Sequence, residues 1–418
     1  MRHMLVNIRR LYKILGPGIL FAGAAIGVSH LVQSTRAGAE FGFALIIFVI
    51  LANIFKYPFF EFGSRYTAAT GKSLIEGYKT LGRFALPLFG IFTLATMFII
   101  AATVTIVTSG LAIQVTGWDI PIMYWNIIVV AIVTGILLVG RFQWLERFLK
   151  VVVLSLAVIT VIALIFALAS GMQGSSDFVA PAVLSTAGVT FLIALMGWMP
   201  APIEISIWHS VWATEEKHGG HKVSKKDSSL DFNIGYIGTA LFALVFLVLG
   251  AFVLYGTGEV FADSAAGFAG QLIDMYTNAL GDWAWWVIAI TAQVTMFSTT
   301  LTVFDAYPRV MNKFVRVMKG EKKYEGRKGY IVWLLLLAAG AIAILATLVD
   351  NMKALVTFAT VMSFLTGPLF AYLNYKVVTK GDMPAKMRPP TWLRALSILG
   401  LVFLVSFSIF YIVWVFVV

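Results

Sequence analysis

The sequence contains no cysteine, and only 12% of its 418 residues are Asp, Glu, Lys or Arg. The lack of cysteine excludes disulfide bonds and metal sites with thiolate ligands. Soluble domains carry about 25% charged residues, so this chain, with 60% hydrophobic residues, is not an ordinary soluble domain. These values are typical of an all-α polytopic membrane protein.

Sequence signatures of common enzymes are also missing. The chain has no HExxH, GxSxG or Walker-type nucleotide-binding motif, and no cluster of carboxylates that would face one cleft. We therefore expect neither an enzyme nor an ATP-driven pump, and we expect no bound cofactor. The lipid bilayer is the expected partner, and no obligate protein partner is evident.

Long apolar runs divide the chain into eleven predicted spans, each about 20 residues or more, the length that crosses a bilayer. Their approximate ranges are 14–36, 41–68, 84–115, 120–140, 144–170, 185–212, 230–256, 283–307, 329–349, 353–378 and 392–417.

Basic residues alternate with these spans. All but three of the 31 Lys and Arg residues lie before span 1, or in the connections after even-numbered spans and the span ends beside them; the exceptions are Arg36, Lys56 and Lys353. By the positive-inside rule, the N-terminus is cytoplasmic and the C-terminus extracytoplasmic in the plasma (inner) membrane. The same asymmetry accounts for the net charge of +11 without a nucleic-acid partner.

Two of the spans are interrupted. Residues 27–30 place Gly, Val, Ser and His inside span 1, and residues 196–204 place Met-Gly-Trp-Met-Pro-Ala-Pro-Ile-Glu inside span 6. Unwound backbone at membrane depth is tolerated where it lines a cavity or is buried in protein. Two broken helices at corresponding positions of two halves indicate a transporter site.

At these positions the sequence resembles the NRAMP family of divalent-metal transporters. The resemblance rests on Gly16-Pro17-Gly18, on Ala37-Gly38-Ala39 with Gly42, on Ala69-Thr70-Gly71 and on Met199-Pro200. It implies a leucine-transporter-type fold in which spans 1–5 (residues 1–170) and 6–10 (171–378) are inverted repeats with broken helices 1 and 6. Residues 379–418 would form an additional span.

The resemblance also shows where this chain departs from the family. Gly27 and His30 stand where the family's helix 1 has the Asp and Asn that bind metal, and Ala201 follows the Met-Pro pair in place of His. Val104 and Val107 occupy the approximate places of acids in the family's proton pathway, and Thr366 that of a helix 10 Gln. We therefore expect weak or absent proton cotransport by the family's route.

The candidate substrate site lies between the two breaks. We expect His30 and Met199 to be metal ligands, because imidazole and thioether groups favour transition metals over Mg²⁺ and Ca²⁺. The alternative for His30 is a hydrogen bond to a backbone carbonyl, and for Met199 core packing. The predicted substrate-binding residues are Gly27, His30, Met196, Met199, Ala201, Glu204 and Thr366.

A polar stripe follows one face of span 8. Thr291, Thr295, Ser298, Thr302 and Asp305 recur at intervals of three and four residues. It indicates either interhelical hydrogen bonds or a water-lined pathway through Ser298, Thr302, Asp305 and also His209. Glu204 either stabilises the start of a half-helix or supplies the negative charge that Gly27 lacks.

Three functions remain open from the sequence. The first is secondary-active or passive transport of a small metal cation, with a transition metal such as Mn or Fe favoured. The second is transport of another small solute, an amino acid or organic cation, on the same fold. The third is a membrane sensor that does not transport.

Overall fold

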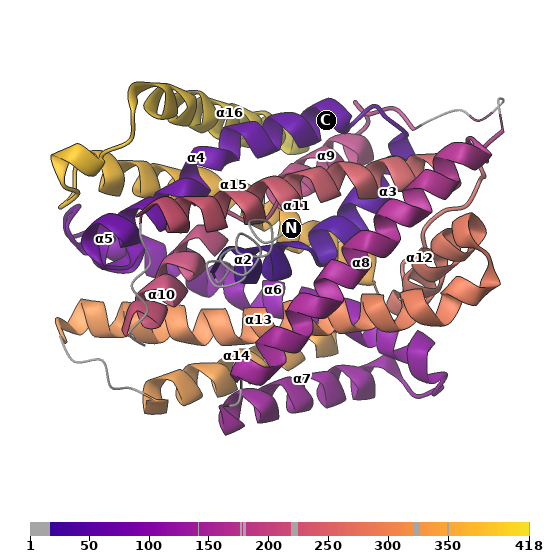
Figure 1. The fold of residues 1–418 in the computed structure, drawn as a ribbon, viewed down its shortest axis with the longest axis horizontal. Coiled ribbons are helices and arrows are strands. Elements are labelled where there is room, and N and C mark those ends of the chain that lie inside the picture. The colour runs from indigo at the N-terminus through magenta and orange to yellow at the C-terminus, as the bar shows by residue number, and fades with distance from the viewer. Residues whose placement is uncertain are drawn as a thin grey trace, which may run out of the picture.

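The computed structural model describes residues 17–417, apart from 141, 176, 177, 179, 180, 219–224, 322–326, 349 and 350. The regular elements of this part of the chain are helices (Figure 1). The first half contains α2 (Pro17–Ala25), π-helix η1 (Val28–Ser34), α3 (Thr35–Phe41), α4 (Ile46–Thr70), α5 (Leu74–Lys79), α6 (Ala85–Thr116), α7 (Ile122–Val139) and α8 (Phe142–Ser170). The second contains α9 (Thr186–Gly197), α10 (Ile205–His218), α11 (Lys225–Val253), α12 (Ala265–Leu280), α13 (Trp285–Lys319), α14 (Arg327–Leu348), α15 (Met352–Thr379) and α16 (Thr391–Val417), with short 3₁₀ turns at Asp282–Ala284 and Ala385–Met387.

Eight helices of the described residues are long and apolar enough to cross a membrane, which supports an all-α membrane protein. They are α4, α6, α7, α11, α13, α14, α15 and α16. The predicted first span is divided into α2, η1 and α3, and the predicted sixth into α9 and α10. Both interruptions therefore occur in the spans where the sequence places them, whereas the total of eleven spans remains a prediction.

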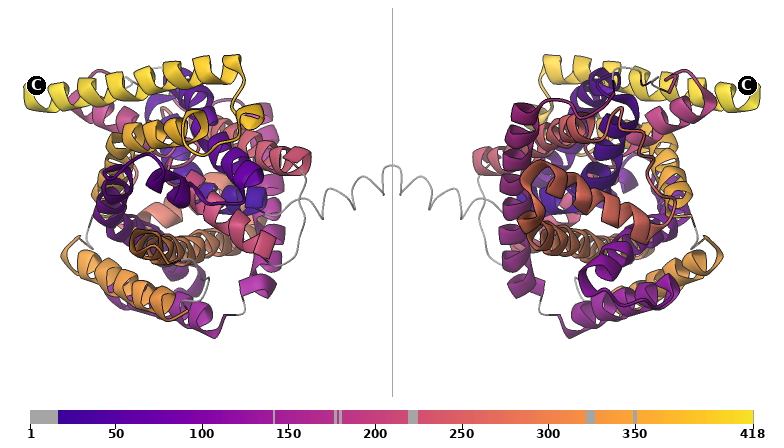
Figure 2. Two further views of the ribbon diagram at one scale, coloured as in Figure 1. Left: turned by 90° about the vertical axis from the view of Figure 1, so that its left-hand side faces the viewer. Right: turned by 90° about the vertical axis from the view of Figure 1, so that its right-hand side faces the viewer.

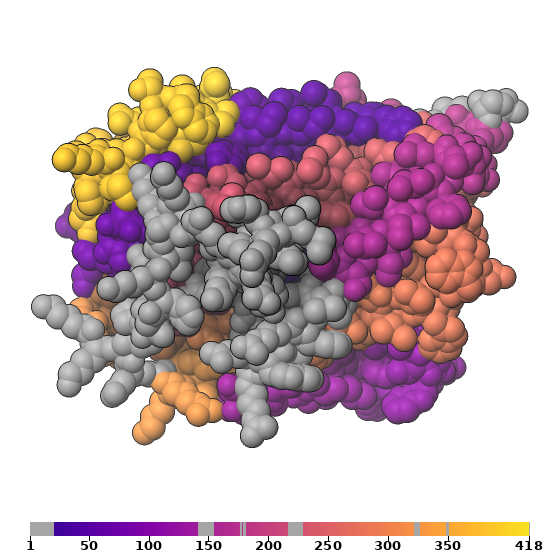
Figure 3. All heavy atoms as spheres, in the orientation of Figure 1, coloured from indigo at the N-terminus to yellow at the C-terminus, as the bar shows by residue number. Residues whose placement is uncertain are grey.

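Burial separates central from peripheral helices. Within the most apolar window of each helix, 72% of residues are buried in α6 and α13, but only 22% in α14 and α16. Figure 2 shows α16 at the outer edge of the bundle, and Figure 3 shows it covering the surface beside α4. Exposed Leu399, Val402 and Phe416 on α16 suit contact with lipid tails. The two broken spans lie inside this shell.

Several of the basic connections lie at one end of the bundle, near α5 and the C-terminal end of α13 (Figure 1). There Lys72 pairs with Asp382 at 2.5 Å, and Lys313 of α13 pairs with Glu76 of α5 at 3.2 Å. A shared end is what the charge pattern predicts. Residues 1–16 and 219–224, which carry further predicted cytoplasmic charge, lie outside the described residues.

Candidate functional site

The break in the first span centres on Gly27. The backbone leaves the α-helix after Ala25 and continues from Val28 as a π-helix, a form often found at functional sites. Gly27 packs against Thr299 of α13: a Cβ built on it would lie 2.5 Å from Oγ1 and 2.8 Å from Cγ2 of Thr299. Thr299 in turn donates a hydrogen bond to the carbonyl of Gly23 at 3.1 Å. The site therefore leaves no room for a side chain at position 27 unless α13 moves.

His30 is directed toward α11. Its Nε2 lies 2.8 Å from the carbonyl oxygen of Thr239, and its Nδ1 lies 2.8 Å from the hydroxyl of Ser29 and 2.9 Å from the carbonyl of Ala25. Because a carbonyl oxygen only accepts hydrogen bonds, Nε2 donates to Thr239, and Nδ1 lies within hydrogen-bond distance of Ser29 and Ala25, so both ring nitrogens have polar partners. The geometry matches the alternative in which His30 holds the backbone of the break, and it gives no support to a metal-ligand role.

The break in the sixth span runs from Trp198 to Glu204. Gly197 ends α9 against α15, where a Cβ would lie 2.1 Å from the carbonyl oxygen of Thr360, so only glycine allows this approach. Pro200 and Pro202 have no backbone N–H and cannot continue the helix. The last carbonyls of α9 are consequently left without helical partners.

These carbonyls converge on a single cation, the ammonium group of Lys56 from α4. Its Nζ lies 2.7 Å from the carbonyl oxygen of Met196 and 2.8 Å from that of Gly197. The carbonyl oxygens of Met199 and Ala201 lie at 3.0 and 3.1 Å. We call these four oxygen atoms the carbonyl cage. Lys56 is 1% exposed, and among the described residues no carboxylate lies within ion-pair distance of it.

Side chains from both breaks and from α15 meet beside the cage. Ser34 of η1 directs its hydroxyl to Sδ of Met199 at 3.5 Å. Gln33 reaches Thr360 at 3.3 Å, and the indole of Trp198 donates to Ser363 at 2.8 Å. The two breaks are thus in direct contact through Ser34 and Met199.

The other predicted substrate-binding residues lie around this centre. Met196 is fully buried and contributes its carbonyl to the cage, as Ala201 does. Thr366 on α15 is buried and donates to the carbonyl of Ser363, the residue that binds Trp198.

Glu204 is the last residue of the second break, and its side chain lies between α6 and α13. Its Oε1 accepts a hydrogen bond from Thr96 of α6 at 2.8 Å, and its Oε2 accepts one from Tyr307 of α13 at 2.8 Å. The carboxyl group is 2% exposed, so it fastens the start of α10 to the core. The two hydroxyl groups were not identified from the sequence, because Thr96 and Tyr307 lie more than 100 residues away on spans with many other hydroxyls.

The polar stripe of α13 is buried, as one helix face should be. The hydroxyl groups of Thr295 and Thr302 donate to backbone carbonyls one turn earlier in the same helix, at 2.8 Å each, so their hydrogen bonds are made within α13. Ser298 is 3% exposed and lies near Gly23 of α2. His209, on α10, is also buried, and neither of its ring nitrogens has a hydrogen-bond partner among the described residues.

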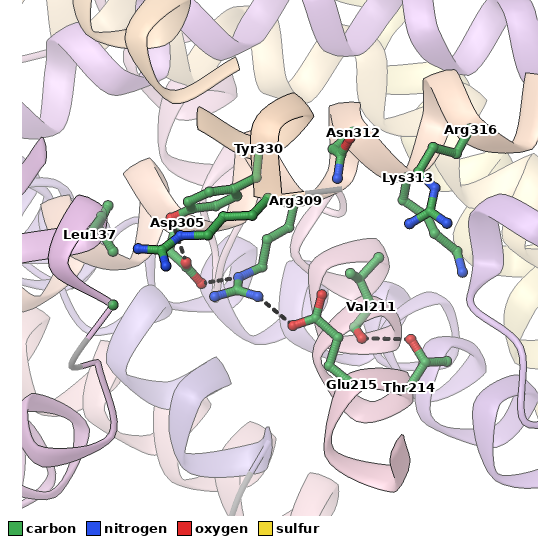
Figure 4. Close-up of a pocket in the computed structure, with 12 residues that line it drawn as sticks. Leu137, Val211, Thr214, Glu215, Asp305, Arg309, Asn312, Lys313, Arg316 and Tyr330 are labelled. Atoms are coloured by element: carbon green, nitrogen blue, oxygen red, sulfur yellow. Dashed lines mark hydrogen bonds and ion pairs between the residues drawn. The ribbon is translucent and has the colours of Figure 1, made fainter. Parts of the chain in front are cut away.

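The stripe ends at a cavity of about 300 Å³ near the basic end of the bundle (Figure 4). Arg309 bridges two acids there, donating to Asp305 at 2.6 Å and to Glu215 of α10 at 2.5 Å. Tyr330 of α14 donates to the other oxygen of Asp305 at 3.0 Å. The carboxylate of Asp305 is therefore paired with Arg309 and Tyr330. This ionic network links α10, α13 and α14 at the mouth of the predicted pathway.

A second ionic network lies at the opposite end. Arg36 donates to Glu40 at 3.2 Å and to Gln33 at 3.3 Å, and Lys353 lies 3.9 Å from both Glu40 and Asp263. Arg36 and Glu40 are four residues apart, the spacing at which opposite charges on a helix pair. Ion pairs thus lie near both ends of the bundle.

Side-chain metal ligands are scarce in this part of the protein. Within the described ranges, no group of three His, Asp or Glu side chains is close enough to hold a metal ion. Oxygen ligands from the backbone are instead concentrated in the carbonyl cage. Any cation bound here would depend on these carbonyls and on the thioether of Met199.

Comparison with known proteins identifies the family. Residues 18–414 match the model of the Nramp family, natural resistance-associated macrophage protein-like. The chain belongs to the Nramp family. This membership supports a membrane transporter rather than an enzyme. The chain is also 40% identical over 405 residues to an uncharacterized protein of Pasteurella multocida, covering 96% of this chain and 92% of that protein.

Solved structures agree on the fold. A manganese transporter of Eremococcus coleocola superposes with a TM-score of 0.73 at 16% identity, covering 98% of this chain and 88% of that one. Mhp1, a nucleobase-cation-symport-1 family transporter, gives 0.62 at 13% identity, covering 96% and 92%. These likenesses support the leucine-transporter-type fold that the resemblance to the family implies.

Proposed function

We propose that this Nramp-family protein is a secondary transporter that carries a metal cation between the breaks of spans 1 and 6. The observation that carries the proposal is the convergence of four carbonyl oxygens on one positive charge. Freed carbonyls of broken helices are the groups that bind cations in transporters of this kind. The structural likeness to a manganese transporter supports a metal as the cargo.

Cargo selectivity in this proposal comes from Met199. Its sulfur lies beside Ser34, at the point where the two breaks touch. A thioether is a soft ligand, so it favours Mn, Fe and other transition metals over Ca²⁺ and Mg²⁺. His30 is assigned the role of holding η1 against α11, because both of its nitrogens are engaged.

The membrane arrangement belongs to the same proposal. We place eleven spans in the bilayer, with residues 1–170 and 171–378 as the two repeats and 379–418 as an added span. The end with Lys72 and Lys313 faces the cytoplasm, and Val418 lies outside. The passage then opens to the cytoplasm near Asp305 and His209, with Ser298 and Thr302 along it.

Uptake by reconstituted protein tests this function. Proteoliposomes with the wild-type chain should take up Mn²⁺ faster than Ca²⁺. Met199→Ala should lower the ratio of Mn²⁺ to Ca²⁺ uptake rates by about tenfold, the equivalent of roughly 1.4 kcal/mol. Met172→Ala, at an exposed methionine outside the breaks, is the matched control and should leave selectivity unchanged. Absence of uptake for every metal tested would contradict the proposal.

A second candidate cargo is an organic ammonium ion or amino acid. One observation favours it: the group that occupies the carbonyl cage is itself a primary ammonium. Proteoliposomes that take up labelled amines or amino acids but no metal would establish this candidate instead. If the protein takes up neither metals nor organic ammonium ions, the remaining function is that of a membrane sensor that does not transport.

A further inference from the structure

We infer that the ammonium group of Lys56 is a tethered cation that fills the carbonyl cage and competes there with the transported cation. This inference deepens the proposed function and rests on it for the identity of the cargo. It makes Lys56 a residue that determines whether, and how tightly, the site between the breaks binds a free cation.

The coordination of Lys56 is that of an ion rather than of a capping side chain. An ammonium group has three N–H donors, yet four carbonyl oxygens surround Nζ at 2.7 to 3.1 Å. One donor must be shared, so the cage has more oxygen atoms than hydrogen bonds need. Oxygens arranged around a point charge are the arrangement that also suits a small free cation.

In the part of the chain that the structure describes, no carboxylate is paired with Lys56. The acid nearest in sequence on α4, Glu61, is bound to Arg65 at 2.6 Å. The positive charge is stabilised instead by the carbonyl dipoles at the C-terminal end of α9, which is the favourable end of a helix for a cation. The carbonyl of Met196 also accepts a backbone hydrogen bond from Met199 at 3.4 Å, but without a cation the other three buried carbonyls would lack partners among the described residues, and burying unpaired polar groups is costly. The break therefore requires a positive charge, whether tethered or free.

A free cation cannot share the cage with Lys56. The oxygens of Met199 and Ala201 belong to the unwound segment that the cargo would contact, and they are already within 3.1 Å of Nζ. Two positive charges among the same four oxygens would repel each other at short range. The cargo must therefore displace the ammonium group, and the long, flexible stem of lysine permits such a movement.

Chemical rescue tests the inference directly. Lys56→Ala removes three methylene groups and the ammonium, which together correspond to propylammonium. The purified variant should melt below the wild type, and propylammonium chloride should raise its melting temperature while leaving that of the wild type unchanged. Lys56→Met keeps most of the stem but removes the charge; its melting temperature should rise with MnCl₂, and its Mn²⁺ affinity should exceed that of the wild type by at least tenfold.

Lys79→Met provides a matched control. Lys79 also donates to a backbone carbonyl, that of Val317 at 2.6 Å, but it lies at the basic end away from the breaks. Its loss should lower stability without any rescue by propylammonium or Mn²⁺. If Lys56→Ala does not fold, the amount of folded Lys56→Met recovered with and without MnCl₂ gives the same comparison.

The outcomes separate this inference from the proposed function. Rescue by propylammonium with no metal uptake by the wild type would support the tethered cation while overturning metal transport. Wild-type metal uptake with unchanged Mn²⁺ affinity in Lys56→Met would overturn the tethered cation and leave transport intact. Lys56 variants as stable as the wild type, or rescued by neither cation, would also overturn it.

Discussion

Gly27 offers a sharp test of how the broken first span is held. A Cβ at this position would lie 2.5, 2.8 and 3.0 Å from Oγ1, Cγ2 and Cβ of Thr299. Rotation of the threonine side chain moves the first two atoms but leaves Cβ in place. Gly27→Ala therefore forces the junction of α2 and η1 away from α13.

The expected cost follows from this overlap. Overpacking a buried contact costs typically about 1–3 kcal/mol. Gly23→Ala, on the same helix, is the matched control, because its Cβ would meet only Ser298 Oγ at 3.9 Å, an ordinary contact. An alanine there should stabilise α2 by roughly 0.5–1 kcal/mol. The two substitutions should thus differ in sign.

Thermal unfolding of the purified protein and cation uptake in proteoliposomes measure the effect. Gly27→Ala should lower the melting temperature and the uptake rate, and adding Thr299→Ala should recover part of both, with a coupling of about 1 kcal/mol. A Gly27→Ala protein as stable and active as Gly23→Ala would refute the reasoning. So would a double variant no better than Gly27→Ala alone.

Two further predictions concern charged residues near the two ends of the bundle. Burial raises the pKa of Glu76, but hydrogen bonds from Ser73 and the charge of Lys313 outweigh it and leave the pKa below its usual 4.5. The stability that this carboxylate contributes is therefore present above about pH 4.5 and lost as the pH falls through the lowered pKa. Glu76→Gln should consequently lower the melting temperature at pH 7 but not near pH 3. A difference in melting temperature that persists at pH 3 would contradict this prediction. In the cysteine-free chain, a cysteine introduced at the exposed position of Lys72 should react only with reagents that cross the membrane into the cytoplasm. A cysteine introduced at the exposed position of Asp263 should react with reagents that do not cross the membrane. The reverse labelling pattern in sealed cells would show that the proposed orientation is wrong.

The elements of this fold are largely predictable from sequence because they depend on local properties. Hydropathy over about 20 residues marks the spans, and Gly27, Pro200 and Pro202 mark the places where two of them break. The polar stripe of α13 follows from helical periodicity alone. Each of these features is set by neighbours in the chain.

The contacts of the candidate site are not local, and the sequence did not specify them. Lys56 binds carbonyls about 140 residues away, and Ser34 reaches Met199 across 165 residues. In the sequence Lys56 stands out only as a basic residue outside the charge pattern, and backbone carbonyls carry no residue signature that would identify its partners. For His30, polarity and position could not decide between a metal ligand and a hydrogen-bonded ring, because the contacts that decide it come from Ser29 and from a backbone carbonyl of α11, more than 200 residues away.

The charge pattern nevertheless contained one usable signal. The many Lys and Arg residues of the basic connections need no specific partner, because their position relative to the membrane explains them. Arg36, Lys56 and Lys353 depart from that pattern, so each requires a partner within the protein. Arg36 and Lys353 meet Glu40, and Lys56 meets the carbonyl cage. In a chain of this class, the cations that topology leaves unexplained are therefore the first places to look for the cation-binding site itself.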